Sequence, residues 1–160
     1  MKVVILGNSG SGKTTMAGRL VERHGLALLD LDTIAWSAPG ERKRFSESIG
    51  DLQAFVNDHA SGWVIEGSYG DLAEAALAHC TELRFLNPGI AACIANCEAR
   101  PFEPHKYASP EEQDANLDML KDWVRQYETR ADTYGLAYHR RVYASFDGEK
   151  REYTDPGDMT

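Results

Sequence analysis

The sequence predicts an α/β fold, in which a parallel β-sheet carries helices on both of its faces. Two observations lead to this prediction. Short apolar runs recur along the chain without polar alternation, which is typical of strands buried on both faces of a sheet. Stretches with apolar residues at helical spacing lie between these runs, and strands that alternate with helices favour right-handed βαβ units.

Five segments have the composition expected of strands. The first, residues 3–6, is a continuous apolar run with β-branched residues. The fourth ends at the turn signal Asn87-Pro88-Gly89, and the fifth follows the turn signal Asp147-Gly148. The expected strands are therefore residues 3–6, 26–29, 63–65, 82–86 and 150–154.

Helical spacing of apolar residues marks the segments between the strands. The first helix is expected over residues 13–23, directly after a glycine-rich stretch. A capping box begins the clearest helix, because Ser109 can cap, Pro110 suits the first helical position and Glu112 lies three residues after the cap. Its apolar face continues to about Tyr134. Shorter stripes predict further helices around residues 45–56, 72–77 and 90–97.

Composition and charge exclude several classes of protein. With 160 residues, 42% of them hydrophobic, the chain is long and apolar enough for a single domain, expected to span residues 1–160. Its 17 Lys and Arg against 25 Asp and Glu give a net charge of −8, which argues against direct nucleic-acid binding. No apolar run approaches the roughly 18–20 residues of a membrane span. The sequence does not distinguish a monomer from a dimer.

The cysteines indicate a reducing compartment. Their odd number does not suit a disulfide framework, and no second pair of metal ligands accompanies the four-residue spacing of Cys93 and Cys97. We interpret these two and Cys80 as small buried thiols. No secretory signal is present, so a cytoplasmic location is expected. Four histidines without partners at metal-ligand spacing are interpreted as structural: His24, His59, His79 and His139.

One motif carries most of the functional information. Residues 7–14 read Gly-Asn-Ser-Gly-Ser-Gly-Lys-Thr and match the phosphate-loop pattern G-x-x-x-x-G-K-S/T between an expected strand and an expected helix. Glycines let backbone N–H groups converge on phosphate oxygens, and the helix start adds its positive end. Lys13 should reach the β- and γ-phosphates and Thr14 a magnesium ion, so ATP and Mg²⁺ are the expected cofactors. The expected cofactor-binding residues are Gly7, Asn8, Ser9, Gly10, Ser11, Gly12, Lys13, Thr14 and Thr15.

Three carboxylates follow expected strands and should share the edge at which this loop opens. Asp30 and Asp32 come after the second strand and Glu66 after the third. Phosphoryl transfer uses carboxylates in the shell of Mg²⁺ and as partners of the acceptor hydroxyl. We place Asp30 with Thr14 at the metal, and Asp32 and Glu66 beside Lys13 in catalysis, although the spacing alone leaves this division open. The competing interpretation is structural: a turn or helix cap for Asp30, a cap for Asp32 and the end of a strand for Glu66.

Two segments look like insertions that supply positive charge and acceptor contacts. The first covers about residues 37–60, and the second about residues 98–109. We expect the second to be a lid that closes over the nucleotide and brings Arg100 to the transferring phosphate. For each Arg and Lys of these two segments, the alternative to a role at the site is a solvated charge on the protein surface. The expected acceptor-binding residues are Asp32, Trp36, Arg42, Arg44 and Tyr69, with packing in the core or at its rim as the alternative for the two aromatic residues.

These residues together resemble the adenylate-kinase and shikimate-kinase-like P-loop kinases. The phosphate loop, the Asp-Leu-Asp of residues 30–32 and the short length carry the resemblance. Residues 31–36, 63–69 and 100–107 are most similar to the topology-modulation, or adenylate-kinase-related, group. The resemblance covers nearly the whole chain. It implies a three-layer P-loop NTPase fold with a five-stranded parallel sheet, helices on both faces, a substrate insertion and a lid.

The sequence therefore predicts an enzyme, a P-loop kinase that transfers a phosphoryl group from ATP to a small-molecule or nucleotide acceptor with the help of Mg²⁺. It does not identify the acceptor, because residues 66–70 match neither the adenylate-kinase nor the shikimate-kinase segment at that position. The alternative is a nucleotide-binding regulatory ATPase module with slow hydrolysis and no small-molecule acceptor.

Overall fold

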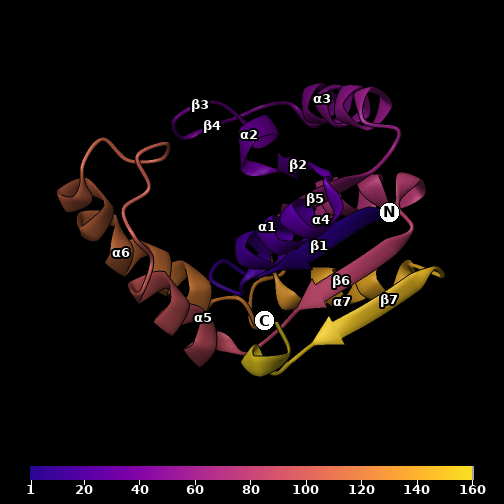
Figure 1. Cartoon of the computed structure of the whole chain (residues 1–160). Helices are drawn as coiled ribbons and strands as arrows, with labels where there is room; N and C mark the ends of the chain where they lie inside the picture. The colour runs from indigo at the N-terminus through magenta and orange to yellow at the C-terminus, as the bar shows by residue number, and fades with distance from the viewer. Residues whose placement is uncertain (160) are drawn as a thin grey trace.

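The computed structural model describes residues 1–159 and contains a five-stranded, fully parallel β-sheet (Figure 1). The strands are β1 (Lys2–Gly7), β2 (Ala27–Asp30), β5 (Trp63–Gly67), β6 (Glu82–Leu86) and β7 (Glu149–Tyr153). Their order is β2-β5-β1-β6-β7, so the first strand of the chain lies in the middle. Val3 and Ile5 are fully buried, as the apolar run predicts. The predicted parallel sheet is confirmed, with each strand within about two residues of its expected place.

Helices cover both faces of this sheet: α1 (Lys13–His24) lies on one face, and α3 (Phe45–Asp58), α4 (Gly70–Ala76) and α7 (Leu136–Ser145) lie on the other. Met16 and Leu20 of α1 pack against Ile5 of the central strand. On the opposite face, Leu52 of α3 and Val142 of α7 belong to the larger core. Within residues 1–159, no helix combines the length and the apolarity needed to cross a bilayer.

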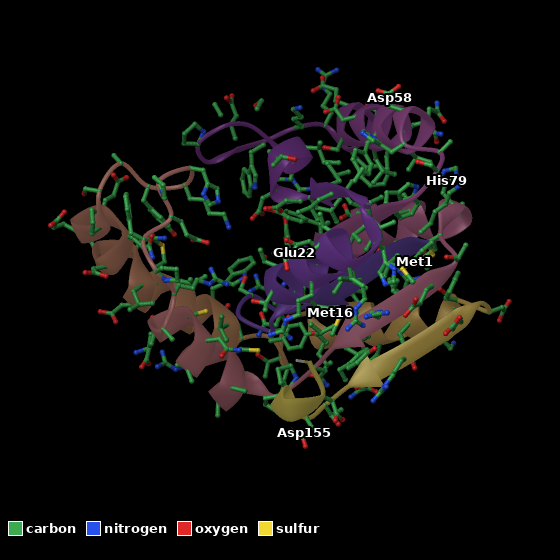
Figure 2. All side chains as sticks on the ribbon, viewed as in Figure 1. Met1, Met16, Glu22, Asp58, His79 and Asp155 are labelled. Carbon is green, nitrogen blue, oxygen red and sulfur yellow. The ribbon has the colours of Figure 1, made fainter. Side chains whose placement is uncertain are left out.

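Because every strand runs in the same direction, the segments after the strands meet at one edge. The glycine-rich loop follows β1, the short helix α2 (Asp32–Ala35) follows β2, and the 3-10 turn η2 (Pro156–Met159) follows β7. In Figure 2 the labelled side chain of Asp155 lies near this carboxyl edge, whereas Asp58 and His79 lie at the opposite end of the sheet. The residues expected to act together therefore share one location.

The segment expected as the first insertion divides into two parts. A small antiparallel hairpin that was not predicted, β3 (Trp36–Ala38) with β4 (Glu41–Arg42), follows α2. After it comes α3, the predicted helix. Leu52 and Val56 of α3 are buried in the main core, whereas Phe45 at the start of its stripe is 50% exposed. The hairpin therefore lies at the surface, whereas α3 packs in the main core and is not part of an insertion.

Two further helices extend from the carboxyl edge of the sheet (Figure 1): α5 (Ile90–Glu98) and α6 (Pro110–Arg125). The predicted cap of α6 is present, because the Ser109 hydroxyl accepts from the backbone N–H of Glu112 at 3.1 Å. Residues 99–109 connect the two helices through turns without helix or strand. This connection is the segment expected to act as a lid.

The prediction that this capped helix continues to about Tyr134 is wrong. The helix α6 ends at Arg125, and the chain turns back before α7, which was not predicted. A local hydrogen bond stabilises the turn, since Asp132 Oδ1 accepts from the backbone N–H of Tyr134 at 3.0 Å. His139 and Val142 are the fully buried residues of α7. So few buried positions make the apolar stripe of α7 too short to be recognised in the sequence.

Candidate functional site

The glycine-rich loop at residues 7–14 joins β1 to α1 with a backbone that requires glycine. Gly10 and Gly12 have φ angles of 78° and 98°, in the left-handed region that disfavours residues with a Cβ. Gly12 directly precedes the first turn of α1, and no side chain caps that turn. The N–H groups of the first turn are therefore left for a ligand, at the positive end of the helix.

A cleft of about 530 Å³ opens over this loop, a size suited to a small molecule. Four positive side chains line it: Lys13 from the loop, Arg19 from α1, and Arg100 and Lys106 from residues 99–109. Glu103 is the carboxylate among the lining residues. In a chain with a net charge of −8, such a concentration of positive charge favours an anionic ligand.

The helix α5 shapes the loop from outside. Asn96 Nδ2 donates to the carbonyl of Gly10 at 2.7 Å, and Gly10 lies against the carbonyl of Cys93 and the thiol of Cys97 without space for a Cβ. Cys93 and Cys97 are buried and free, as predicted. Asn96 was not predicted as a site residue, because a lone asparagine on a helix belongs to no recognisable pattern.

Lys13 is buried beneath the cleft, with 7% of its surface exposed. Its ammonium group donates to the carbonyl of Asn8 at 2.7 Å. Burial lowers the pKa of Lys13, and the negative charge of Glu66 partly opposes this effect. Burial disfavours the charged form of Lys13, so a negatively charged phosphate group beside its ammonium would stabilise that form.

Glu66 and Asp30 lie side by side at the ends of β5 and β2, where they are partners in the strand register. Glu66 is 3% exposed, and its Oε1 accepts a hydrogen bond from the Thr14 hydroxyl at 3.0 Å. Burial raises the pKa of both carboxyls; Lys13 opposes the rise at Glu66, whereas the charge of Asp32 adds to it at Asp30. Thr14, expected beside Asp30, thus has its hydrogen bond with Glu66.

Asp32 faces a different part of the carboxyl edge. The Tyr69 hydroxyl donates to Asp32 Oδ1, and Lys106 Nζ lies 3.5 Å from Asp32 Oδ2. The Asp30 carboxylate also accepts from the backbone N–H of Asp32 at 2.9 Å, so the turn role considered for Asp30 is present. Glu66 therefore has its hydrogen bond with the loop and Asp32 has its partners in Tyr69 and the segment 99–109, whereas Asp30 adjoins both of these carboxylates.

An aromatic cluster, consisting of Trp36, Tyr69 and Tyr134, borders Asp32. Trp36 Nε1 donates to the Tyr69 hydroxyl at 2.8 Å, and the rings of Tyr69 and Tyr134 meet edge to face at 5.3 Å. The Arg42 guanidinium lies 4.9 Å from the centre of the Tyr69 ring and donates to the Tyr134 hydroxyl. Tyr69 is 6% exposed and Trp36 40%, so Tyr69 also packs in the core while Trp36 stays accessible. Tyr134 was missed because the turn that brings it here was not predicted.

The remaining predicted residues lie less close together. Arg44 is exposed at the position preceding α3, and its neighbour Lys43 pairs with Asp51 at 2.8 Å. The cations at positions 42–44 therefore do not act as one cluster. Thr15 is exposed and lines the cleft. His139 is buried between the Tyr127 hydroxyl and the Ser68 carbonyl, in agreement with its structural interpretation.

The residues of this edge fit a nucleoside triphosphate with Mg²⁺. In the part of the chain that the structure describes, Ser11 Oγ is buried without a hydrogen-bond partner, beside the open N–H groups of the loop. Within residues 1–159, no group of three or more His, Cys, Asp or Glu could hold a metal ion alone. Mg²⁺ commonly takes one or two protein oxygens and completes its shell with water and phosphate. Thr14, Glu66 and Asp30 offer such oxygens next to the cleft.

A cationic cleft and three carboxylates, Asp30, Asp32 and Glu66, thus meet at the carboxyl edge. No protein-family model and no curated protein matches the chain. The geometry of this edge is therefore the basis for a functional conclusion.

Proposed function

We propose that this protein is a P-loop kinase that transfers the γ-phosphoryl group of ATP to a small-molecule or nucleotide acceptor, assisted by Mg²⁺. One observation carries the proposal: two residues that line the cationic cleft contact the carboxylates, Thr14 the Glu66–Asp30 pair and Lys106 the Asp32 carboxylate. Phosphoryl transfer needs both carboxylate positions, one for the metal shell and one for the acceptor. The same observation supports the resemblance to adenylate-kinase-related proteins.

On the donor side, the chain supplies open N–H groups and positive charge. The first turn of α1 and the Lys13 ammonium would bind the polyphosphate, and Thr14, Glu66 and Asp30 would hold Mg²⁺. When bound, Mg²⁺ neutralises negative charge on the phosphate oxygens. Arg100 lines the same cleft and stabilises the charge that develops on the transferring group.

On the acceptor side, Asp32 orients the attacking hydroxyl and accepts its proton. The Tyr69 hydroxyl holds Oδ1 of this carboxylate, which leaves Oδ2 for the acceptor. Lys106 lies 3.5 Å from Oδ2, so it has to move aside or bind a negative group of the acceptor. Trp36 offers its exposed face, and Arg42 is fixed next to it by the other rings of the cluster.

Residues 99–109 act as the lid. Their contact with Asp32 is the Lys106 ion pair, and Gln113 fastens them to α6: it accepts from the Glu103 N–H at 2.8 Å and donates to the Pro101 carbonyl at 3.1 Å. The lid therefore moves together with the beginning of α6. Closing it excludes water from the transferring group and limits wasteful hydrolysis.

The donor side is tested by nucleotide titration of the Lys13→Ala variant. We expect it to lose ATP·Mg²⁺ binding by at least about a hundredfold, because a buried cation at the phosphates is removed. Lys121→Ala is the matched control, since Lys121 pairs with Glu98 at 2.9 Å and is not among the residues that line the cleft. Unchanged ATP affinity in Lys13→Ala would refute the assignment of the loop.

The acceptor side is tested by measuring ADP formation with a panel of hydroxyl- and phosphate-bearing compounds. A kinase forms ADP quickly only with its own acceptor. Slow hydrolysis that is the same with every compound would contradict phosphoryl transfer and support the regulatory ATPase instead. The two tests are independent, because nucleotide binding is measured without an acceptor.

A further inference from the structure

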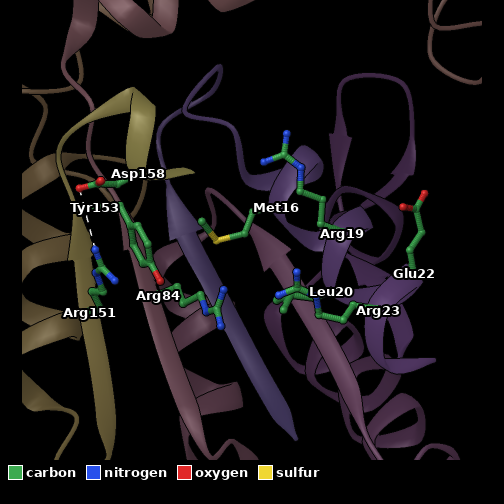
Figure 3. Close-up of a pocket in the computed structure, with 9 residues that line it drawn as sticks. All are labelled: Met16, Arg19, Leu20, Glu22, Arg23, Arg84, Arg151, Tyr153 and Asp158. Atoms are coloured by element: carbon green, nitrogen blue, oxygen red, sulfur yellow. Dashed lines mark ion pairs between the residues drawn. The ribbon is translucent and has the colours of Figure 1, made fainter. Parts of the chain in front are cut away.

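Positive charge alone does not mark a phosphate site in this protein. A second cavity, of about 580 Å³, lies between α1 and the strands β6 and β7, and Arg84 and Arg151 are among its lining residues (Figure 3). Both are already paired, Arg84 with Glu82 at 2.6 Å and Arg151 with Asp158 at 3.9 Å, and Glu22 adds a carboxylate to the lining. What distinguishes the glycine-rich loop is a backbone that presents donors, so the groups that hold this backbone bear on phosphate binding.

The peptide between Gly10 and Ser11 connects the loop to α5. In a trans peptide the carbonyl and the N–H point in opposite directions. The Gly10 carbonyl accepts from Asn96 Nδ2 at 2.7 Å, and the Ser11 N–H donates to the Asn8 carbonyl at 3.2 Å. Lys13 Nζ donates to that same Asn8 carbonyl at 2.7 Å. One peptide plane thus connects Asn96 to the carbonyl that the Lys13 ammonium binds, and rotation of this plane would break two hydrogen bonds.

Gly10 does not fix this peptide by itself. Because glycine lacks a Cβ, it tolerates φ angles of either sign, and its φ of 78° is one of several conformations open to it. The backbone carbonyl of Cys93 packs against Gly10, but a carbonyl is an acceptor and cannot bind the Gly10 carbonyl. Asn96 supplies the donor that selects one orientation of the peptide.

A second contact joins the loop to the same pair of helices. Asn8 is 5% exposed, and its Nδ2 donates to the carbonyl of Val124 in α6 at 3.3 Å. The helices α5 and α6 pack against each other through Cys93, Cys97 and Val124. The loop is therefore held at Asn8 and at Gly10 by one helical unit, which also carries the lid between its two helices.

We propose that Asn96 is a positioning residue for polyphosphate binding: its carboxamide holds the peptide between Gly10 and Ser11 in the orientation that the phosphate-bound loop requires. It acts through this peptide and the Asn8 carbonyl on the Lys13 ammonium. The proposal rests on the proposed function, because it assumes that the glycine-rich loop binds phosphate.

Calorimetric titration with inorganic tripolyphosphate and Mg²⁺ tests the proposal, because this probe has phosphate groups but no nucleoside. Two variants are compared: Asn96→Leu is similar in size but has no donor, and Asn96→Gln keeps the carboxamide. We expect Asn96→Leu to bind the probe about fivefold more weakly than the wild type, because one hydrogen bond to the loop is lost. Asn96→Gln should stay within about twofold of the wild type, since its carboxamide can still donate to the Gly10 carbonyl.

Two controls accompany the titration. Asn57→Leu is the matched control, because Asn57 is exposed on α3, accepts from Gln53 at 3.0 Å and is not among the residues that line the cleft. Its affinity for the probe should equal that of the wild type. Lys13→Ala measures any probe that binds outside the cleft. Asn96 is itself exposed, so its variants should keep the fold, which circular dichroism verifies.

Equal affinities of Asn96→Leu and Asn96→Gln, whether both match the wild type or both are weakened, would overturn the proposal, since the carboxamide would then not hold the loop. A wild type that does not bind tripolyphosphate would overturn it as well, and would refute the donor side of the proposed function at the same time. The two failures are distinguishable, because a wild type that binds the probe leaves the donor side intact whatever the Asn96 variants do.

Discussion

Replacing Gly10 by alanine tests how the glycine-rich loop is held against α5. Gly10 has a φ of 78°, and a Cβ at this position would collide with the Cys93 carbonyl and come within 2.8 Å of Cys97 Sγ. Gly40, in the hairpin of β3 and β4, has a φ of 76°, but a Cβ there would meet nothing within 4 Å. Comparison of the two alanine variants therefore separates the effect of backbone conformation from that of crowding.

The structure gives different magnitudes for the two substitutions. A left-handed backbone costs alanine about 1 kcal/mol, which is the loss of unfolding free energy expected for Gly40→Ala. In Gly10→Ala the clash adds about 2 kcal/mol, because it involves a backbone carbonyl that no side-chain rotation can move. For a chain of this length, a total of about 3 kcal/mol lowers the melting temperature by about 9 °C, against about 3 °C for Gly40→Ala.

Urea unfolding followed by circular dichroism measures both free energies, and nucleotide titration measures the consequence for the loop. We expect ATP to bind about tenfold more weakly to Gly10→Ala, since the displaced loop misaligns its N–H groups. Gly40→Ala should bind ATP like the wild type. Equal stability losses in the two variants would show that α5 does not restrain the loop, and this would refute the reasoning.

Three further predictions concern the acceptor side, the lid and the core. Asp32→Asn keeps an acceptor for the Tyr69 hydroxyl but removes the charge, so turnover should fall at least about a hundredfold while ATP affinity changes little; equal losses in both would contradict an acceptor-side role. Arg100→Ala should lower turnover about tenfold or more without changing the urea midpoint. Wild-type rates would show instead that Arg100 is a solvated surface charge without a role in the reaction. Burial lowers the pKa of His139 from 6.5 to about 4. The unfolded chain therefore takes up this proton first as the pH falls, and about 3 kcal/mol of stability present above pH 6.5 is lost by about pH 4. His139→Gln should remove this part of the pH dependence, and urea midpoints of the two proteins that fall in parallel between pH 7 and 4.5 would disprove it.

Thr14 was expected beside Asp30 but has its hydrogen bond with Glu66, and the order of the strands explains this difference. Asp30 and Glu66 are far apart in the chain. No pattern in the sequence shows that β2 and β5, the strands that they follow or end, are neighbours in the sheet. The observed order places β2 beside β5, which makes Asp30 and Glu66 register partners. The proximity of two buried carboxyls, and the direction of both pKa shifts, follows from that neighbourhood.

The sequence by itself determined the features that depend on local chemistry. The continuous apolar runs, of which residues 3–6 are the clearest, predicted the buried parallel strands. Ser109 with Glu112 predicted the start of α6, and the glycines of residues 7–14 predicted a glycine-dependent loop before α1, in which Gly10 and Gly12 adopt positive φ angles. In each case a side chain, or its absence, acts on the backbone within a few residues, so the pattern is readable without knowledge of the fold.

Only the tertiary structure decided which distant groups meet. The return of the chain after Arg125 brings Tyr134 to Arg42, α5 brings Asn96 to the glycine-rich loop, and adjacent strands set Arg84 beside Arg151. None of these contacts has a sequence period, because each depends on how two elements pack against each other. The physical reason is that packing follows the shape and burial of whole faces, whereas a motif records the preferences of a single segment.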